Sequence, residues 1–265
     1  MTPIGHAMTH AAVPAADSIF AEFPARTYLE KYYSAVGPEN DALLRSITDY
    51  VSRRQIVTDT VIEVAGGPCL FSLMALAAVR GAAFEHVTFT DIGWRNLREV
   101  DAWLRDDRAQ FQYTCALEWL ADELGAKPAD VTANLRDSRW DLTEFDWRQP
   151  VPAPWEAAHD VVSCHFFAES ATDDKNELVS FLAKVRRLAR PGGTLLLSFM
   201  CRSSGYTLGR SEFPAFGVDR KSIFRHLELG GLDLADIEIS EVAAENPASN
   251  PGYDGLLFVG GRLAD

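Results

Sequence analysis

Cysteine and histidine are scarce in this sequence, and none of them is spaced as a metal or redox motif requires. The six histidines form no HExxH pattern, and the four cysteines form no CxxC pair. Zinc ribbons and dithiol redox sites need such short spacings. The sequence therefore predicts no metal site, and it predicts that Cys69, Cys115, Cys164 and Cys201 are buried free thiols.

The sequence also lacks long apolar runs and an excess of basic residues. No stretch is long enough to cross a bilayer, and the opening MTPIGHAMTHAAVPAADS has neither the basic start nor the apolar core of a secretory signal. The 25 basic and 38 acidic side chains give a net charge of −13, which repels nucleic acid. We therefore expect a cytoplasmic protein, monomeric or weakly homo-oligomeric, that binds a small molecule and neither nucleic acid nor a membrane.

The 265 residues and the 47% hydrophobic content suit one domain with a substantial core. Residues 1–23 are rich in Ala, Thr and Pro without a clear period, and we expect them to form a mobile leader. Apolar residues then recur at helical spacing, which predicts two cap helices within residues 24–58. Residues 24–265 are expected to form a single domain.

From residue 60 onward, strand and helix patterns alternate. β-Branched runs are followed by amphipathic helical stretches, which predicts βαβ units and a parallel sheet. The expected fold is α/β, a Rossmann-like doubly wound sheet of seven mostly parallel strands with helices on both faces, closed by an antiparallel pair. The expected strands are 60–64, 86–91, 134–142 (NLRDSRWDL), 159–167, 194–200, 234–240 and 255–263.

The first strand leads into an AGGP turn, Ala65–Pro68, and then into a helix. Glycines let a ligand approach the main chain, and the N–H groups of a helix start can bind its polar end. Glu63 lies in the strand just ahead of this turn. Although an isolated AGGP turn is weak evidence, its place between strand and helix favours a nucleotide or cofactor loop.

Two acidic residues are expected at the tips of the next strands. Asp91 ends the second strand, where a carboxylate can accept both ribose hydroxyls; a turn or helix cap before WRNL is the alternative. Asp141, placed at the end of the third strand, is a candidate acceptor for an adenine amino group. Because no GxGxxG cradles a pyrophosphate, the acidic surroundings favour a sulfonium nucleoside, S-adenosyl-L-methionine, over a dinucleotide.

Tyr28, Tyr32 and Tyr33 lie on the first cap helix. Their rings could cover the cofactor and attract its cationic sulfur. Packing into the core is an equally good interpretation of their spacing.

Several motifs together resemble a known family. TYLEKYY, IEVAGGP, TDIGWRNL, the Asp of WDLT, the RPGG turn and RSSGYTLG are similar to the family of nicotinamide, phenylethanolamine and indolethylamine N-methyltransferases, from about Pro24 to the C-terminus. The resemblance implies the class I S-adenosylmethionine-dependent methyltransferase fold and the product S-adenosyl-L-homocysteine. The cofactor residues that it implies are Tyr28, Tyr33, Gly66, Gly67, Phe71, Asp91, Asn96, Asp141, Leu142 and Cys164.

The sequence departs from the family pattern at several positions. Ala65 replaces the first glycine of the usual turn, and Phe199 stands where the nicotinamide enzyme carries an Asp that binds its substrate. Glu169 lies one residue from the position of a substrate-amine carboxylate in the phenylethanolamine enzyme. The resemblance places Ser203 and Tyr206 in the acceptor pocket, and Arg202 is a candidate partner for an acceptor carboxylate.

Methyl transfer is an in-line displacement that needs an acceptor with a free lone pair. A carboxylate or histidine must therefore position the nitrogen and take up its proton, directly or through water. Glu169 and His165, which follow the fourth strand, are the candidates, with Tyr28 covering the sulfur. The structural alternatives are a helix-capping role for Glu169, a core role for His165 and a surface position for Arg202.

Two other functions stay open at this point. Because Phe199 removes a polar acceptor contact, the protein could be a cyclase or lyase that acts on the cofactor's own aminobutyrate chain. Ala65 and Phe199 together also allow a protein that binds S-adenosylmethionine without turnover. The sequence favours N-methyl transfer to a small amine or heteroaromatic nitrogen.

Overall fold

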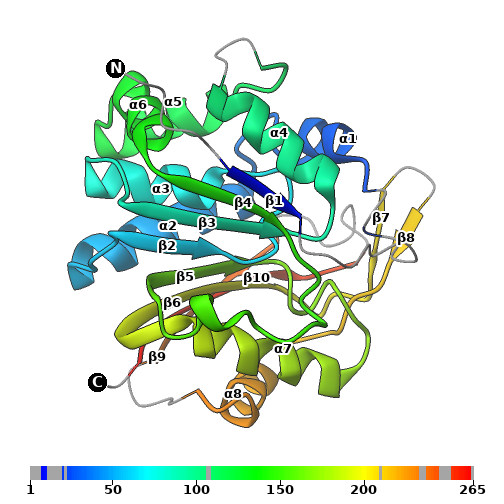
Figure 1. Ribbon diagram of the computed structural model, residues 1–265. Helices are drawn as coiled ribbons and strands as arrows, with labels where there is room; N and C mark the ends of the chain where they lie inside the picture. Colours follow the sequence, from blue (N-terminus) through cyan, green and yellow to red (C-terminus); the bar gives the residue numbers. More distant parts are fainter. Residues whose placement is uncertain are drawn as a thin grey trace.

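The structure is a computed structural model that describes residues 7–10, 20, 23–105, 109–208, 211–232, 237–244 and 252–263. A single large sheet organises these residues (Figure 1). Its strands are β1 (Ala7–His10), β2 (Thr60–Glu63), β3 (His86–Asp91), β4 (Trp140–Glu144), β5 (His159–His165), β6 (Ala189–Cys201), β9 (Ile237–Ala243) and β10 (Gly255–Arg262). Their order is β1-β4-β3-β2-β5-β6-β10-β9. The pairs are parallel from β1 to β6, and β10 is antiparallel to both β6 and β9.

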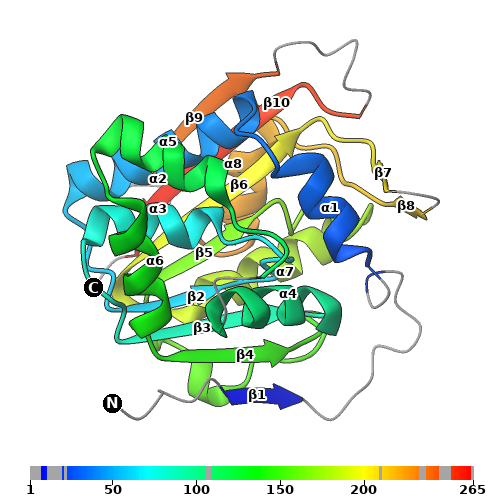
Figure 2. The same ribbon diagram turned by 90° about the horizontal axis from the view of Figure 1, so that it is seen from above.

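Helices cover both faces of the sheet, as Figure 2 shows from above. One face carries α2 (Pro38–Arg54), α3 (Phe71–Arg80), α4 (Trp94–Arg105), α5 (Thr114–Leu124) and α6 (Pro128–Asp137), with α1 (Ala25–Tyr32) at the end toward which the parallel strands run. The other face carries α7 (Lys175–Leu188) and α8 (Arg220–Leu229), together with a short 3₁₀ turn, η1 (Ala153–Trp155).

Each central strand contributes to two hydrophobic cores because successive side chains point to opposite faces. Val61 and Val161 pack into the core beneath α2 and α3, whereas their neighbours Ile62 and Val162 pack into the core beneath α7. A parallel strand buried on both faces needs a continuous apolar run, and the runs in the sequence supply it. The expected doubly wound, mostly parallel sheet with its antiparallel closing pair is confirmed.

Two features of the sheet differ from the sequence expectation. Ala7–His10, inside the expected leader, form an eighth strand parallel to β4; most of residues 1–23 lie outside the described part of the chain. In addition, the strand expected over residues 134–142 begins only at Trp140, because Asn134–Asp137 end helix α6. That helix has a proline in its first turn and buries Val131 and Leu135, four residues apart on one face.

A small hairpin of β7 (Tyr206–Leu208) and β8 (Ser211–Phe213) stands apart from the main sheet, beside α1. Phe20 and Phe23 pack their rings against Phe213, at centroid distances of 5.3 and 5.4 Å. Segments from the two ends of the chain therefore meet over the carboxyl ends of the strands. No helix within the described residues is both long and apolar enough to cross a membrane.

Gly260 in β10 lets α2 pack closely on the sheet. A Cβ atom at this position would lie 2.5–2.8 Å from three ring atoms of Tyr50, whose side chain is fully buried. We predict that Gly260→Ala lowers the free energy of unfolding by about 1–3 kcal/mol, the usual cost of overpacking a core. Urea denaturation measures this change.

Gly37→Ala, at the start of α2, is the matched control, because no atom lies within 4 Å of the place that the added methyl group would take. Because alanine is a poorer N-cap than glycine but meets no clash here, the change should lower the free energy of unfolding by less than about 1 kcal/mol. A Gly260→Ala protein as stable as the wild type would contradict this packing.

Candidate active site

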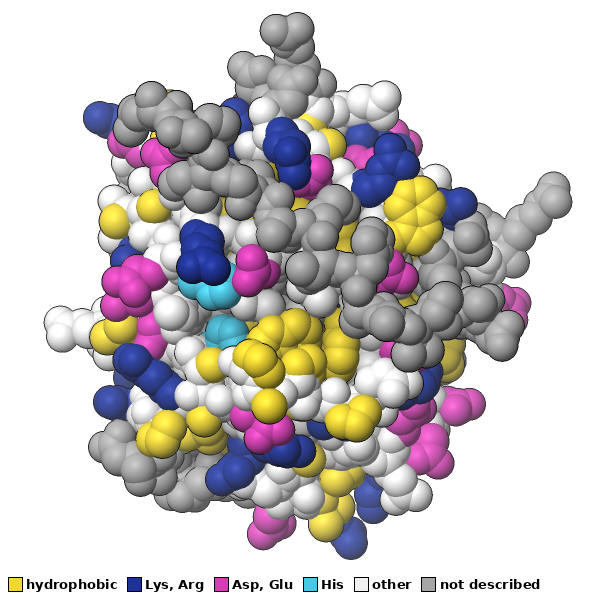
Figure 3. Space-filling view, in the orientation of Figure 1, with side chains coloured by type: hydrophobic (Ala, Val, Ile, Leu, Met, Phe, Trp, Pro, Cys, Tyr) yellow, Lys and Arg dark blue, Asp and Glu magenta, His cyan; other side chains and the backbone are white. Residues whose placement is uncertain are grey.

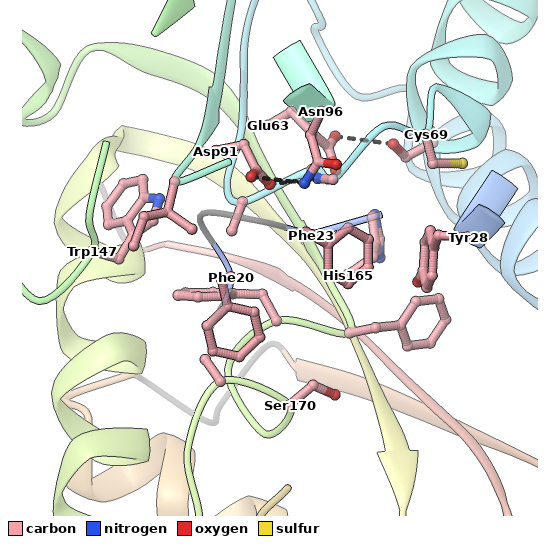
Figure 4. A pocket seen from close by; sticks show the side chains of 18 of the residues that line it. Phe20, Phe23, Tyr28, Glu63, Cys69, Asp91, Asn96, Trp147, His165 and Ser170 are labelled. Carbon is pink, nitrogen blue, oxygen red and sulfur yellow. Dashed lines mark hydrogen bonds between the residues drawn. The ribbon is translucent and has the colours of Figure 1, made fainter. Parts of the chain in front are cut away.

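A pocket opens where the parallel strands β2, β3 and β5 end, the place where open α/β sheets bind their ligands (Figure 4). It holds about 990 Å³ of empty space, including the solvent at its mouth. The structure brings many of the residues expected from the sequence together in its lining. These are Tyr28, Tyr33, Glu63, Gly66, Gly67, Phe71, Asp91, Asn96, His165 and Tyr206.

The AGGP turn forms one wall of the pocket. Only glycine fits at position 66, because a Cβ atom there would clash with the Phe89 ring at 2.5 Å and with the Glu63 side chain at 2.7 Å. Gly67 has φ 61°, and its Cβ direction is open, so the main chain is accessible from the pocket. Ala65 adopts φ 49°, a left-handed conformation that favours glycine, so the turn keeps its geometry at a strain cost despite the methyl group.

Asp91, at the end of β3, holds this wall together. One carboxylate oxygen accepts from the Gly67 amide at 2.8 Å, and the other accepts from the Gly93 amide at 2.7 Å and from Asn96 at 2.9 Å. Burial raises the pKa of Asp91, and these three donors act in the opposite direction. Figure 4 shows Asp91 and Asn96 joined at one side of the open space.

Glu63, at the end of β2, is a second buried carboxyl in the lining. Ser72 of α3 donates to it at 3.0 Å, and Ser163 is its register partner on the neighbouring strand β5. Burial raises the pKa of Glu63 to about 8, against the effect of both serines. In the ligand-free protein near neutral pH, Glu63 is therefore mostly protonated.

Tyr28 and Tyr33 of the α1 segment lie against each other, with ring centroids 5.5 Å apart. The Tyr33 ring meets the edge of Phe71 at 5.0 Å. Burial raises the pKa of both tyrosines, so both hydroxyls keep their protons and can donate to a ligand. The tyrosines thus line the pocket and also pack in or against the core. Their place over the cofactor stays a prediction.

The other half of the pocket is aromatic. Phe20, Phe23, Phe166, Phe167 and Tyr206 line it, and the Tyr206 ring stacks on Phe213 at 4.8 Å. Phe166 has φ 57°, which a bulky residue rarely adopts. Strain of this kind is often found at binding sites, where the surrounding structure holds it in place.

His165 lines the pocket but has no free ring nitrogen. Nε2 lies 2.9 Å from the Ser163 hydroxyl, and Nδ1 lies 2.9 Å from the Ser198 hydroxyl. Burial lowers the pKa of His165 to about 3, so the ring is neutral. This arrangement argues against His165 as the group that takes a proton directly from an acceptor.

Glu169 lies just behind the pocket, fully buried. Its Oε1 accepts from the Met200 amide at 2.8 Å, while its buried Oε2 has no hydrogen-bond partner. Burial raises the pKa of Glu169 to about 7. Ser170 lines the pocket and its hydroxyl lies 3.4 Å from Glu169 Oε1, so it connects the carboxyl to the pocket space.

Asp141 and Leu142 are not placed where the sequence analysis expected them. Asp141 is the second residue of β4, far from its carboxyl end, and its carboxylate binds His86 at 2.9 Å. Leu142 is buried in the core. Because β4 starts and ends later than expected, the residues that follow its end and line the pocket are Phe145, Asp146, Trp147 and Arg148.

Four further candidates also lie outside the pocket lining. Cys164 and Phe199 are buried in the core beneath α7, on the face of the sheet away from Glu63. Arg202 is half exposed and forms an ion pair with Asp254. Ser203 is buried in the turn ahead of β7, where its hydroxyl accepts from the Gly205 amide at 3.5 Å.

The residues that the sequence analysis missed come mainly from segments after strand ends. Trp147 follows β4, and its indole N–H donates to the Thr90 hydroxyl at 3.2 Å, which fixes the ring beside β3. The residues FDW at 145–147 directly follow the end of β4 at Glu144, so a correct boundary for this strand would have identified them as candidates for the pocket. Phe20 and Phe23 carry no local signal in the sequence, because only long-range packing brings them to the pocket.

A family model describing the NNMT/PNMT/TEMT family matches residues 11–262. Curated relatives include the nicotinamide N-methyltransferase of Homo sapiens, 24% identical over 91% of this chain and 94% of that protein. The phenylethanolamine N-methyltransferase of Macaca mulatta is 24% identical over 91% and 89%. The indolethylamine N-methyltransferase of Mus musculus is 24% identical over 91% and 93%.

Solved structures with the same fold include S-adenosylmethionine-dependent methyltransferases. One from Clostridium acetobutylicum has a TM-score of 0.54 at 11% identity, covering 91% of this chain and 99% of that chain. Another, from Methanosarcina mazei, has a TM-score of 0.53 at 13% identity over 80% and 97%. With the family match over nearly the whole chain, this protein belongs to the NNMT/PNMT/TEMT family and is an S-adenosylmethionine-dependent methyltransferase.

Proposed function

We propose that this protein transfers the methyl group of S-adenosyl-L-methionine to a nitrogen of a small amine or heteroaromatic acceptor. The relatives that match it along most of their length are named as N-methyltransferases. The observation that carries the proposal is one pocket with two halves, an acidic one built around Asp91 and an aromatic one built around Phe166. The acidic half suits a cationic nucleoside, and the aromatic half suits a small organic acceptor.

The charge of the lining fits this cofactor. Glu63, Asp91 and Asp146 all line the pocket. The one cation among the described lining residues, Arg148, is paired with Glu177 at 2.8 Å and lies 3.7 Å from Asp146. The acidic groups therefore outnumber the basic ones, and the positive charge of a sulfonium and an ammonium group favours the ionised forms of Glu63 and Asp91.

Each part of the cofactor has suitable residues. Asp91 would accept the ribose hydroxyls, and the open main chain at Gly67 would receive the amino acid portion under the hydroxyls of Tyr28 and Tyr33. Asp146 would accept from the adenine amino group beside the Trp147 ring. Asp146 thus takes the role that the sequence analysis gave to Asp141.

The chain's contribution to catalysis is mainly alignment. When bound, S-adenosylmethionine supplies an electrophilic methyl group that the lone pair of the acceptor displaces from sulfur. The aromatic half excludes water and holds the acceptor, and orientation of this kind can lower a barrier by about 7–11 kcal/mol. Neutral His165 adds no positive charge to repel the sulfonium.

Glu169 is the proposed proton acceptor when the acceptor is an amine that carries a proton. Ser170 lines the pocket and its hydroxyl donates to Glu169, so it would pass the proton to Glu169, whose pKa of about 7 suits proton transfer near neutral pH. Glu169 is therefore a positioning and proton-accepting group that acts through Ser170. The acceptor itself contacts the aromatic side chains.

We further propose that the protein works on small molecules in the cytoplasm. All four cysteines are free thiols, as is usual in a reducing compartment. The net charge is −13, and on the face shown in Figure 3 the described Lys and Arg side chains are scattered among acidic ones. This net charge and the mixed charges of that face do not favour binding to nucleic acid.

The structure removes the arguments for the two alternative functions, a cyclase or lyase and a binding protein without turnover. Phe199 lies in the core beneath α7 and not in the pocket, so it removes no acceptor contact. Ala65 adopts the left-handed conformation that the turn needs. Neither residue therefore favours a cyclase, a lyase or a protein without turnover.

Asp91→Asn tests the ribose site. The change removes the charge of a group that we expect to accept two hydroxyls, so affinity for S-adenosylmethionine should fall by about 1–3 kcal/mol. Isothermal titration calorimetry on folded protein measures it, with Asp49→Asn on the exposed face of α2 as the control. Equal affinity in Asp91→Asn and wild type would remove Asp91 from this role.

A pair of variants locates the adenine site. Asp146→Asn should weaken the binding of both S-adenosylmethionine and S-adenosylhomocysteine by about tenfold or more, the scale for losing a charged hydrogen bond. Asp141→Asn should leave both affinities unchanged. Weaker binding in Asp141→Asn with unchanged binding in Asp146→Asn would instead place the adenine at Asp141, as the sequence predicts.

Glu169→Gln tests proton acceptance. With an amine acceptor, wild-type kcat/KM should rise with pH through about 7, because only the ionised carboxylate accepts a proton. Glu169→Gln should lose about 100-fold in kcat/KM and lose this pH step. Glu156→Gln, which removes a surface ion pair with Arg187, is the control; an unchanged pH profile in Glu169→Gln would contradict the role.

A further inference from the structure

Hydrogen bonds from two different segments hold the glycine turn of the pocket. The first half of the turn is bound to β3, because the Gly67 amide donates to Asp91 at 2.8 Å. The second half begins at Pro68, which has no N–H group to donate. Its carbonyl oxygen accepts a hydrogen bond from the hydroxyl of Tyr113, the residue that precedes α5.

Tyr113 approaches the turn from the core. Its side chain is 2% exposed and belongs to the core beneath α2 and α3, and it is not part of the pocket lining. Pro68 is buried as well, whereas its neighbours Gly67 and Cys69 both line the pocket. The bond between Tyr113 and Pro68 therefore lies on the core side of the turn, and the Pro68 carbonyl points away from the pocket.

The conformation of Tyr113 fixes the position of its hydroxyl. Tyr113 has φ 52° and ψ 26°, a left-handed conformation that is uncommon for a bulky residue. The edges of Phe111 and Trp103 enclose its ring at centroid distances of 4.9 and 5.7 Å. A buried hydroxyl needs a hydrogen-bond partner, and this placement gives it the Pro68 carbonyl. Burial also raises the pKa of Tyr113 well above its ordinary value, so the hydroxyl keeps the proton that it donates.

The direction of the Pro68 carbonyl decides what the turn presents to the pocket. The peptide bonds of the described residues are trans, and in a trans peptide the C=O and N–H groups point in opposite directions. With the Pro68 oxygen on the core side, the Cys69 N–H is directed toward the pocket side. Its hydrogen bond to the Gly66 carbonyl is long, at 3.4 Å, and one N–H can be shared between two acceptors. The Cys69 N–H can therefore also donate to a ligand.

Cys69 lies where the proposed function places the amino acid portion of the cofactor. Figure 4 shows Cys69 on the same side of the open space as Tyr28, and Trp147 on the opposite side. Helix α3 begins at Phe71, only two residues after Cys69. Main-chain N–H groups at the start of a helix suit a carboxylate, which is one end of that amino acid portion.

We propose that Tyr113 is a positioning residue for the amino acid portion of the cofactor: by holding the Pro68 carbonyl toward the core, its hydroxyl keeps the Cys69 N–H turned toward the cofactor's carboxylate. This inference rests on the proposed function. Without the hydroxyl, the peptide between Pro68 and Cys69 can rotate and turn its carbonyl oxygen toward the same carboxylate, which it repels. Tyr113 itself touches no ligand and acts through the turn.

Tyr113→Phe tests the hydroxyl, because it removes the donor and keeps the ring. The two probes are S-adenosylhomocysteine and 5′-methylthioadenosine, which has the same nucleoside and sulfur but a methyl group in place of the amino acid portion. In isothermal titration calorimetry, the affinity of Tyr113→Phe for S-adenosylhomocysteine should be about tenfold lower than that of the wild type. Its affinity for methylthioadenosine should be unchanged.

Tyr50→Phe is the matched control. It removes the hydroxyl of another buried tyrosine, 1% exposed, whose ring packs against Phe258 of β10 outside the pocket lining. This variant should bind both ligands as the wild type does. An unchanged affinity of Tyr113→Phe for S-adenosylhomocysteine would overturn the inference. An equal loss of affinity for both ligands would also overturn it, because the hydroxyl would then support the pocket in general.

NMR of the wild-type chain labelled with ¹⁵N-cysteine tests the Cys69 N–H without altering Tyr113. The chain has four cysteines, and loss of one amide signal in Cys69→Ser assigns it. Saturation with S-adenosylhomocysteine should shift the Cys69 amide proton downfield, as a hydrogen bond to a carboxylate does, whereas methylthioadenosine should not. A Cys69 signal that stays in place while S-adenosylhomocysteine binds would overturn this inference alone. Absence of binding heat with both ligands on folded wild-type protein would overturn the proposed function on which it rests.

Discussion

The carboxylate of Asp91 is the constraint on which the site depends. It stands at the end of a central parallel strand and accepts hydrogen bonds from Gly67, Gly93 and Asn96. These donors come from the glycine turn after β2, the turn after β3 and the start of α4, so one side chain fixes three segments. Burial penalises the charge of this carboxylate, and the main-chain donors oppose that penalty. These hydrogen bonds therefore hold the buried carboxylate of Asp91 in position at the pocket wall, where it can accept from hydroxyl groups of a ligand.

The rest of the pocket lining also carries more carboxyl groups than cationic side chains. Glu63 shares the acidic half, and no lysine is among the described lining residues. A ligand that carries positive charge therefore relieves the cost of burying these carboxyls, whereas a ligand with phosphates adds to it. The aromatic half is built by segments distant in sequence, Phe23 near α1 and Phe213 on the hairpin, which meet at 5.4 Å. In the proposed function, charge therefore selects the cofactor, and the aromatic side chains receive the acceptor.

Much of this site could be predicted from the sequence because its signals are local. The AGGP turn and the Asp at the end of HVTFTD follow strands whose apolar runs are clear, and the structure places both in the pocket. Asp141 shows where local reasoning fails: helix α6 extends to Asp137 and β4 begins only at Trp140, so Asp141 lies near the start of the strand, and Asp146, after its end, lines the pocket. Phe199 shows a second limit, since the alternation of a strand decides whether a side chain meets the pocket or the opposite core. The contact between His165 and Ser198 depends on the register between β5 and β6, which no local pattern reveals.

A crystal structure with S-adenosylhomocysteine tests the central claim most directly. The account predicts ribose hydroxyls within hydrogen-bond distance of Asp91, adenine beside Asp146 and the Trp147 ring, and the amino acid portion beside Gly67. A nucleoside bound elsewhere, or a ribose that makes no contact with Asp91 in this pocket, would contradict it.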